Sequence, residues 1–172
     1  EIDALTQTMG SMKRTIRRFL DINMAMSSEK NFDRLLPRLL GETLSAADAD
    51  AGILYLADND MLAPAAAIKG DGTTLAINSG NIDTKACGPL LSSALLSGSP
   101  YAARLTASDI KSLGLSDIVQ TSLTQNAIAV PLLNRQQNLV GAMILLRNEA
   151  TDEARLSFIG ALSGSAAVSL EN

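Results

Sequence analysis

Histidine and tryptophan are absent from this 172-residue sequence, which also contains only one cysteine, two tyrosines and three phenylalanines. Without histidine, the chain has no Ser–His or Cys–His dyad and no histidine ligand for zinc or haem. The single cysteine, Cys87, permits neither an internal disulfide nor a cysteine cluster for zinc or iron–sulfur. These absences exclude most familiar catalytic layouts and indicate a reducing compartment.

Positive charge and long apolar runs are also scarce. Fourteen Lys and Arg against eighteen Asp and Glu give a net charge of −4, which together with the few aromatic residues argues against a nucleic-acid partner. No apolar run approaches the roughly 20 residues of a membrane-spanning helix, and the first residues lack the apolar core of a signal peptide. The length and the 47% of hydrophobic residues suit one core. We therefore expect a cytoplasmic regulatory or binding domain.

The first 27 residues carry apolar side chains at alternating steps of three and four, which is a heptad pattern. The seam consists of Ile2, Met9, Ile16 and Asn23 at a positions and Leu5, Met12, Phe19 and Met26 at d positions. A single Asn at an a position is known to fix register and oligomer state. The pattern predicts a parallel coiled-coil dimer. The alternative is a long helix that packs on its own domain, which the off-seam residues Leu20, Ile22 and Met24 favour.

A second amphipathic helix is expected after residues 27–31, with its apolar side chains on one face: Phe32, Leu35, Leu36, Leu39, Leu40 and Leu44. Pro37 lies inside this pattern and removes a helical hydrogen bond. The sequence thus predicts either a kink at Pro37 or a helix that begins near it.

Short apolar runs separated by turns follow. Residues 51–57 and 61–68 predict one β-hairpin around Asp58-Asn59-Asp60, and residues 126–133 and 139–147 predict another. Between them we expect a brief strand at 74–77, a loop at 78–81, a helix at 85–97, a short strand at 101–104 and a short helix at 108–113. A last helix is expected to be capped by Thr151 or Asp152 and to end near Leu170.

The predicted fold class is α+β. Short connections imply antiparallel pairing, so we expect one central antiparallel sheet of about five or six strands. The N- and C-terminal helices would cover one face of this sheet, and the variable helix and loop segment at about 70–125 would cover the other.

Four segments of the chain resemble a GAF domain. They are Phe32 to Pro37 leading into 47–56, then 127–132, 139–145 and the closing segment 156–170. The resemblance covers residues 28–172 and implies a GAF/PAS-like fold with a sensory function in signalling proteins. Residues 1–12 resemble the end of a HAMP linker, although Asp3 stands where that family often has Gly and Met9 where it often has Phe. Residues 1–27 would then be a HAMP-like signalling coiled-coil helix.

The HAMP-like resemblance implies a larger bacterial receptor, of which this chain would be a cytoplasmic portion anchored at the inner membrane. A GAF domain in that position implies a covalently linked output domain, such as a cyclic-di-nucleotide enzyme, a cyclase, a histidine kinase or a phosphatase. We expect a homodimer through the N- and C-terminal helices. Gly160 and Gly164, four residues apart, would permit close helix approach there, or a tight contact with the sheet.

The GAF resemblance places any ligand between the sheet and the variable middle segment. The chain has no histidine that could ligate haem. A bilin chromophore is usually attached to a Cys that is followed by His, and here Gly88 follows Cys87. The residues that mark cyclic-nucleotide-binding relatives are not found in order, so no cofactor is evident and an unidentified small ligand is expected. Polar side chains of the middle segment are Arg104, Asp109, Thr121, Ser122, Thr124 and Asn126. From these and the thiol, the candidate ligand-binding residues are Arg104, Thr124, Asn126 and Cys87.

Two carboxylate pairs, Asp48 with Asp50 and Asp58 with Asp60, invite a calcium hypothesis. Counting twelve positions from each pair reaches Asn59 and Lys69 where a bidentate Glu is required, so no metal site is predicted. The leading functional hypothesis is a non-catalytic, dimeric sensor. The alternatives are a ligand-free structural dimerisation or transmitter module and a Cys87-based redox sensor or GAF-type reductase.

Overall fold

The computed structural model describes residues 32–77, 80–116, 118 and 126–171. The strands of its six-stranded sheet run in the order β3-β2-β1-β6-β5-β4, and every neighbouring pair is antiparallel. They are β1 (Ala51–Asp58), β2 (Met61–Lys69), β3 (Ile82–Asp83), β4 (Tyr101–Arg104), β5 (Asn126–Leu133) and β6 (Leu139–Arg147). The helices are α2 (Phe32–Ala47), α3 (Gly88–Ser97), α4 (Ala107–Leu113) and α6 (Glu153–Glu171). The predicted heptad seam lies outside the described residues.

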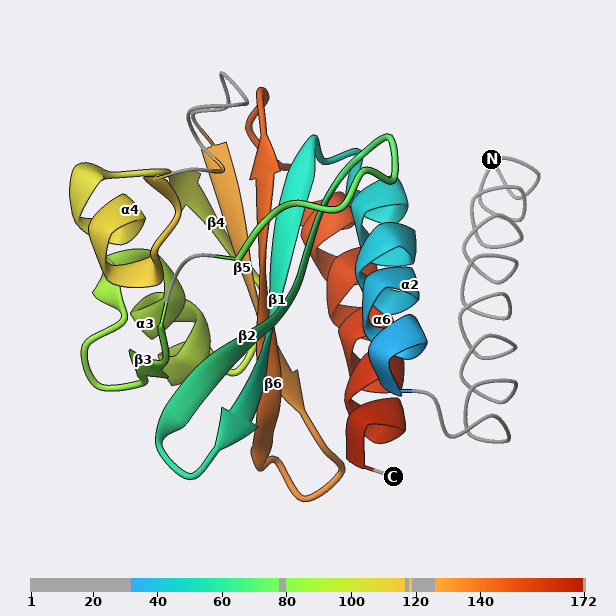
Figure 1. Ribbon diagram of the computed structural model, residues 1–172, viewed down its shortest axis with the longest axis vertical. Helices are drawn as coiled ribbons and strands as arrows, with labels where there is room; N and C mark the ends of the chain where they lie inside the picture. Colours follow the sequence, from blue (N-terminus) through green and yellow to red (C-terminus); the bar gives the residue numbers. More distant parts are fainter. Residues whose placement is uncertain (1–31, 78–79, 117, 119–125, 172) are drawn as a thin grey trace.

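The described residues form three layers. Helices α2 and α6 cover one face of the sheet, and α3 and α4 cover the other (Figure 1). Each face is apolar because the side chains of the central strands alternate between two separate clusters of buried residues. The expected α+β class, the antiparallel sheet and the division of the helices between its two faces are confirmed.

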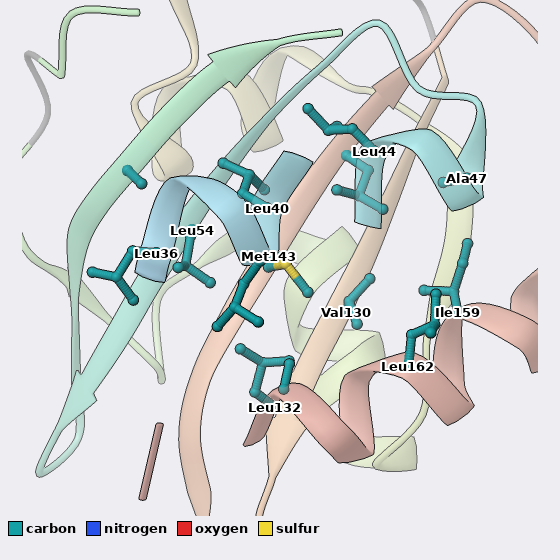
Figure 2. Packing of buried hydrophobic residues seen from close by; sticks show 14 of the residues in the cluster. Leu36, Leu40, Leu44, Ala47, Leu54, Val130, Leu132, Met143, Ile159 and Leu162 are labelled. Carbon is teal, nitrogen blue, oxygen red and sulfur yellow. The ribbon is translucent and has the colours of Figure 1, made fainter. Parts of the chain in front are cut away.

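The core on the α2 and α6 face is built from the predicted helical stripe. Leu36, Leu40 and Leu44 of α2 point towards the sheet, where they meet residues of β1 and β6 (Figure 2). Ile159 and Leu162 add the apolar side of α6 to the same cluster. Both helices are therefore held to the sheet by side chains that are removed from water, which stabilises them by about 1.5–3 kcal/mol for each large apolar residue.

Helix α2 begins at Phe32 and contains Pro37, so the expectation that the helix begins near Pro37 is wrong. The turn that precedes the proline carries Leu35 and Leu36, each only 5% exposed. Their burial keeps this turn helical despite the hydrogen bond that the proline removes.

The hairpin turn between β1 and β2 forms as predicted. Asp58 pairs with Met61, and Asn59 adopts a left-handed backbone with φ of 57°. Asn tolerates this conformation better than most residues. The strands β5 and β6 have the predicted bounds, and the Asn134 side chain accepts hydrogen bonds from the Gln136 and Asn138 amides in the turn between them.

The segment between β2 and α3 differs from the prediction. In place of a strand at 74–77, the structure has an isolated bridge from Ile68 to Thr74, and strand β3 forms at Ile82–Asp83. A two-residue strand carries no periodic signal, which is why the sequence did not indicate it. Helix α3 starts at Gly88 and not at residue 85, because Asp83 accepts hydrogen bonds from the backbone of Lys85 and Ala86 and holds these residues in a turn.

Helices α2 and α6 contact each other and run in opposite directions. The start of α2 and the end of α6 consequently lie at the same end of the molecule (Figure 1). At the other end, the Arg155 guanidinium donates a hydrogen bond of 3.0 Å to the Ala47 carbonyl oxygen. This bond joins the first turn of α6 to a carbonyl at the end of α2 that has no partner within its helix.

Candidate functional site

The sheet face beneath α3 is lined by small side chains. Ala103 of β4 pairs with Ala127 of β5, and Ala129 lies two residues further along the same side of β5. Ala142 of β6 belongs to the same cluster. These four alanines, which we call the alanine floor, leave room above the sheet for larger side chains from another element.

Helix α3 fills this space with its own residues. Leu90, Leu91 and Ala94 are buried against the sheet, and α3 contacts β4, β5 and α4. Because these side chains occupy the place where a GAF-like ligand is expected, the conformation described by the structure is closed over the alanine floor.

One buried carboxylate connects α3 with α4. Asp109 is 1% exposed, and its Oδ1 accepts a hydrogen bond of 3.0 Å from the Leu90 amide in the first turn of α3. Its Oδ2 accepts from the Thr106 hydroxyl at 2.7 Å and the Thr106 amide at 3.2 Å, while the Asp109 amide donates to the Thr106 hydroxyl oxygen. We call this set of hydrogen bonds the Asp109 bridge. A single side chain thus satisfies amides at the starts of two helices.

A buried tyrosine fastens α4 to the sheet. Tyr55 of β1 is fully buried, and its hydroxyl donates a hydrogen bond of 2.9 Å to the Leu113 carbonyl oxygen at the end of α4. Burial raises the pKa of the Tyr55 hydroxyl well above its ordinary value, because the phenolate would lose its hydration. The hydroxyl therefore remains protonated and acts as a hydrogen-bond donor.

Cys87 lies at the position that precedes α3, and its thiol is fully buried. The thiol donates to the Thr84 carbonyl oxygen at 3.4 Å, and its sulfur lies 3.5 Å from the Ser92 hydroxyl oxygen. The Cys87 side chain accepts no hydrogen bond from the first turn of α3. The Asp109 carboxylate accepts the hydrogen bond from the Leu90 amide in its place.

Three of the four predicted ligand-binding residues lie in the described part of the chain, and the structure places them on both faces of the sheet. Arg104 and Asn126 lie opposite each other on β4 and β5, and strand alternation places both on the α2 and α6 face, on the side of Ala102 and Ile128. Cys87 belongs to the cluster on the opposite face. The Asn126 amide group donates to the Asn148 carbonyl oxygen at 3.1 Å, beyond the end of β6.

Thr124, the fourth predicted ligand-binding residue, lies outside the described residues. Among the residues that the structure describes, no group of three or more acidic or cysteine side chains is placed to hold a metal ion. In the same part of the chain, no helix combines the length and the apolar composition needed to cross a bilayer.

Sequence reasoning missed the roles of Tyr55 and Asp109. The local signal for Asp109 was present, since Thr106 and Asp109 have the spacing of a capping box. Its bond to Leu90 has no local signal because the two residues are 19 positions apart.

A family model of the GAF domain matches residues 31–170, most of the chain. The chain belongs to the GAF family. GAF domains are regulatory and sensory modules in many signalling proteins, which agrees with the coarse expectation from the sequence. No curated protein matches this chain.

Solved GAF-type structures share the fold at low sequence identity. A GAF domain of A. aeolicus in an inactive state has a TM-score of 0.65 and 11% identity, and the match covers 93% of this chain and 98% of that one. The free methionine-R-sulfoxide reductase of Neisseria meningitidis, in complex with its substrate, gives 0.62 and 17%, with 91% and 88% covered. A phycocyanobilin-bound GAF domain of a cyanobacterial phytochrome gives 0.64 and 11%, with 91% and 92% covered.

Proposed function

We propose that this GAF domain is a non-catalytic sensory module that binds a small ligand on the α3 side of its sheet and relays the change through α2 and α6. The arrangement of the terminal helices carries this proposal. The helix that enters the domain and the helix that leaves it lie side by side on the face opposite α3, and the start of α2 and the end of α6 meet at one end (Figure 1).

A change in packing on one face of the sheet can reach the other face through the strands themselves. On β5, Ala127 and Ala129 belong to the α3 side, whereas Ile128 and Val130 belong to the α2 and α6 side. A change in the packing of α3 therefore alters strands that also support α6. A ligand shifts this equilibrium only by the difference between its affinities for two packings, typically about 1–3 kcal/mol.

The wider context of the module is part of the same proposal. The HAMP-like segment at 1–27 would pair two copies and connect the domain to the membrane, with the domain in the cytoplasm and an output enzyme after α6. The composition of α6 supports pairing there, since residues 156–170 contain no charged side chain although Ala161 and Gly164 are exposed. Gly160 does not share this exposed surface, because a Cβ there would lie 3.4 Å from Pro100 of its own domain.

One observation favours a second function, that of a ligand-free transmitter. In the described part of the site, Leu90, Leu91 and Tyr55 fill the space above the sheet with almost no exposure to water. A domain whose ligand space is permanently filled would pass on only the movements of its terminal helices.

The reductase alternative receives less support from the residues present. One structural relative is a reductase with bound substrate. Thiol-based reduction forms an oxidised intermediate that a second thiol resolves. This chain has only Cys87, which is fully buried, and a single thiol has no internal partner to resolve an oxidised intermediate.

Native mass spectrometry of the freshly purified chain tests the proposal. A dimer with a discrete added mass supports the sensor and gives the mass of its ligand. A dimer without added mass, which stays unchanged when mixed with cellular small-molecule extracts, favours the ligand-free transmitter. A monomer at micromolar concentration contradicts pairing through residues 1–27.

A further inference from the structure

Helix α3 is fastened differently at its two ends. Its first turn is held by the Asp109 bridge, in which the carboxylate reaches over from α4 to the Leu90 amide. Its last turn ends in Gly98, whose left-handed backbone, with φ of 70°, donates a hydrogen bond to the Ala94 carbonyl oxygen. Strand β4 follows only three residues later and pairs with β5. The end of α3 is thus tied closely to the sheet through the chain. Its start lies five residues after the two-residue edge strand β3, so it depends more on side-chain contacts.

Helix α4 contacts α3 and has its own attachment to the sheet. The hydroxyl of Tyr55 holds its last residue to β1, and the capping box of Thr106 and Asp109 stabilises its first turn. Leu113 is fully buried against the same apolar cluster as Tyr55. Asp109 therefore projects from a helix with its own attachment to the sheet.

The backbone at the start of α3 is shaped for close approach of this carboxylate. Gly88 has a φ of 87°, which disfavours any residue with a side chain. A Cβ at Gly88 would lie 2.9 Å from Asp109 Oδ1. The glycine thus permits the contact that the bridge needs.

We infer that the Asp109 bridge is a latch, and that its release allows the first turn of α3 to swing away from the sheet about Gly98. Opening would uncover the apolar inner side of α3 together with the alanine floor. That space suits a small apolar molecule, so this inference rests on the proposed ligand-binding function and names the step that would admit the ligand. In the bridge, one carboxylate accepts hydrogen bonds from both helices. Its loss would therefore free the start of α3 from α4, while the Tyr55 hydroxyl would still hold α4 to the sheet.

Cys87 provides a built-in reporter for this movement. It is the only thiol in the chain, it is fully buried, and it directly precedes the turn that would move. Its rate of reaction with the disulfide reagent DTNB under native conditions measures how often the start of α3 opens.

The variant Asp109→Asn tests the latch. The carboxylate accepts from Leu90 with one oxygen and from Thr106 with the other. An amide side chain replaces one of these oxygens with an NH2 donor, so it loses one of the two acceptor positions, and the bond that remains loses the charge of its acceptor. Loss of a charge-assisted hydrogen bond should raise the Cys87 labelling rate by about 10- to 100-fold. The matched control is Asp152→Ala, which removes a carboxylate that accepts from the Arg155 amide at the start of α6, on the opposite face. Its labelling rate should stay within about twofold of the wild-type rate at a denaturant concentration well below the unfolding midpoint.

Two results would overturn the inference: labelling of Asp109→Asn at the wild-type rate, or equal acceleration by Asp152→Ala. Should Asp109→Asn not fold, hydrogen exchange on the wild-type chain decides. If the latch opens locally, the opening free energy measured at the Leu90 amide should be lower than that measured at the amides of central strand β6. If both sets of amides exchange only through global unfolding, the latch is contradicted. Because no ligand is present in these measurements, they report on the latch even where native mass spectrometry has refuted the sensor.

Discussion

At the scale of single residues, two buried polar side chains form directional hydrogen bonds that the apolar core cannot supply. Tyr55 donates a hydrogen bond to the backbone of α4, Asp109 accepts one from the backbone of α3, and both side chains are almost completely removed from water. Leaving a buried partner unsatisfied costs about 1–3 kcal/mol, so each side chain contributes to stability and to the choice of one arrangement of α3 and α4.

Tyr55→Phe should lower the free energy of unfolding by about 1–2 kcal/mol, because the Leu113 carbonyl oxygen loses its donor. Urea denaturation measures the effect. Tyr101→Phe is the matched control, since Tyr101 is 41% exposed, and it should change stability by less than about 0.5 kcal/mol. Equal effects of the two substitutions would contradict a special role for the Tyr55 hydroxyl.

The same tyrosine predicts a pH dependence. Because burial raises the pKa of Tyr55 in the folded state, the unfolded chain releases this proton first as the pH rises past about 10. Ionisation then favours the unfolded state, so stability should fall by up to about 1.4 kcal/mol per pH unit above that point. The wild type should lose stability more steeply than Tyr55→Phe between pH 10 and about 11.5 in urea denaturation series. Parallel curves would show that Tyr55 ionises freely in the folded state.

At the scale of elements, close backbone approach decides where glycine is required. Gly141 of β6 pairs with Leu56 of β1, and a Cβ at Gly141 would lie 2.5 Å from the Tyr55 carbonyl oxygen. Gly164 of α6 is exposed, and a Cβ there would meet nothing within 4 Å. The same substitution should therefore have opposite effects at these two positions.

Gly141→Ala should destabilise the domain by about 1–3 kcal/mol, because strand β1 must shift to admit the methyl group. Gly164→Ala should stabilise it by up to about 1 kcal/mol, because alanine has the higher helix propensity. Thermal unfolding of the two variants beside the wild type measures both. A loss of stability in Gly164→Ala would indicate that this surface of α6 is occupied by a partner chain.

At the scale of the whole molecule, the sheet separates two groups of helices. Helix α3 and the alanine floor lie on one side, and α2 and α6 lie on the other. The start of α2 and the end of α6 lie at the same end of the domain (Figure 1). In the proposed function, the α3 side binds the ligand, α2 and α6 relay the change, and two copies pair through the helices that enter and leave the domain.

Pairing through the heptad seam predicts the behaviour of one variant. Asn23→Leu should strengthen association of the chain, because a buried polar a position costs stability, and it should also loosen the register and the oligomer state. Sedimentation equilibrium at several micromolar concentrations measures both properties. A wild-type chain that remains monomeric, together with an unchanged Asn23→Leu variant, would contradict the seam.

The sequence by itself determined the elements with repeating patterns. The apolar stripe of α2 and the runs of β5 and β6 span several periods, so the helix and the two strands were predicted, the strands with their observed bounds. The N-cap Asp152 and the Asn59 turn follow from local backbone chemistry, which adjacent residues determine. The two-residue strand β3 depends on pairing and has no local signal. The turn before Pro37 had conflicting local signals, an apolar stripe and a proline, and burial of Leu35 and Leu36 decided between them.

The candidate site was decided only by the tertiary structure. Arg104, Asn126 and Cys87 are polar residues from one region of the sequence, but strand alternation and the position of α3 put Cys87 on the opposite face from the other two. The Asp109 and Tyr55 contacts join residues 19 and 58 positions apart. Such contacts form because the sheet brings distant segments together and buried polar groups must find partners, a requirement that acts on three-dimensional neighbours and not on neighbours in sequence.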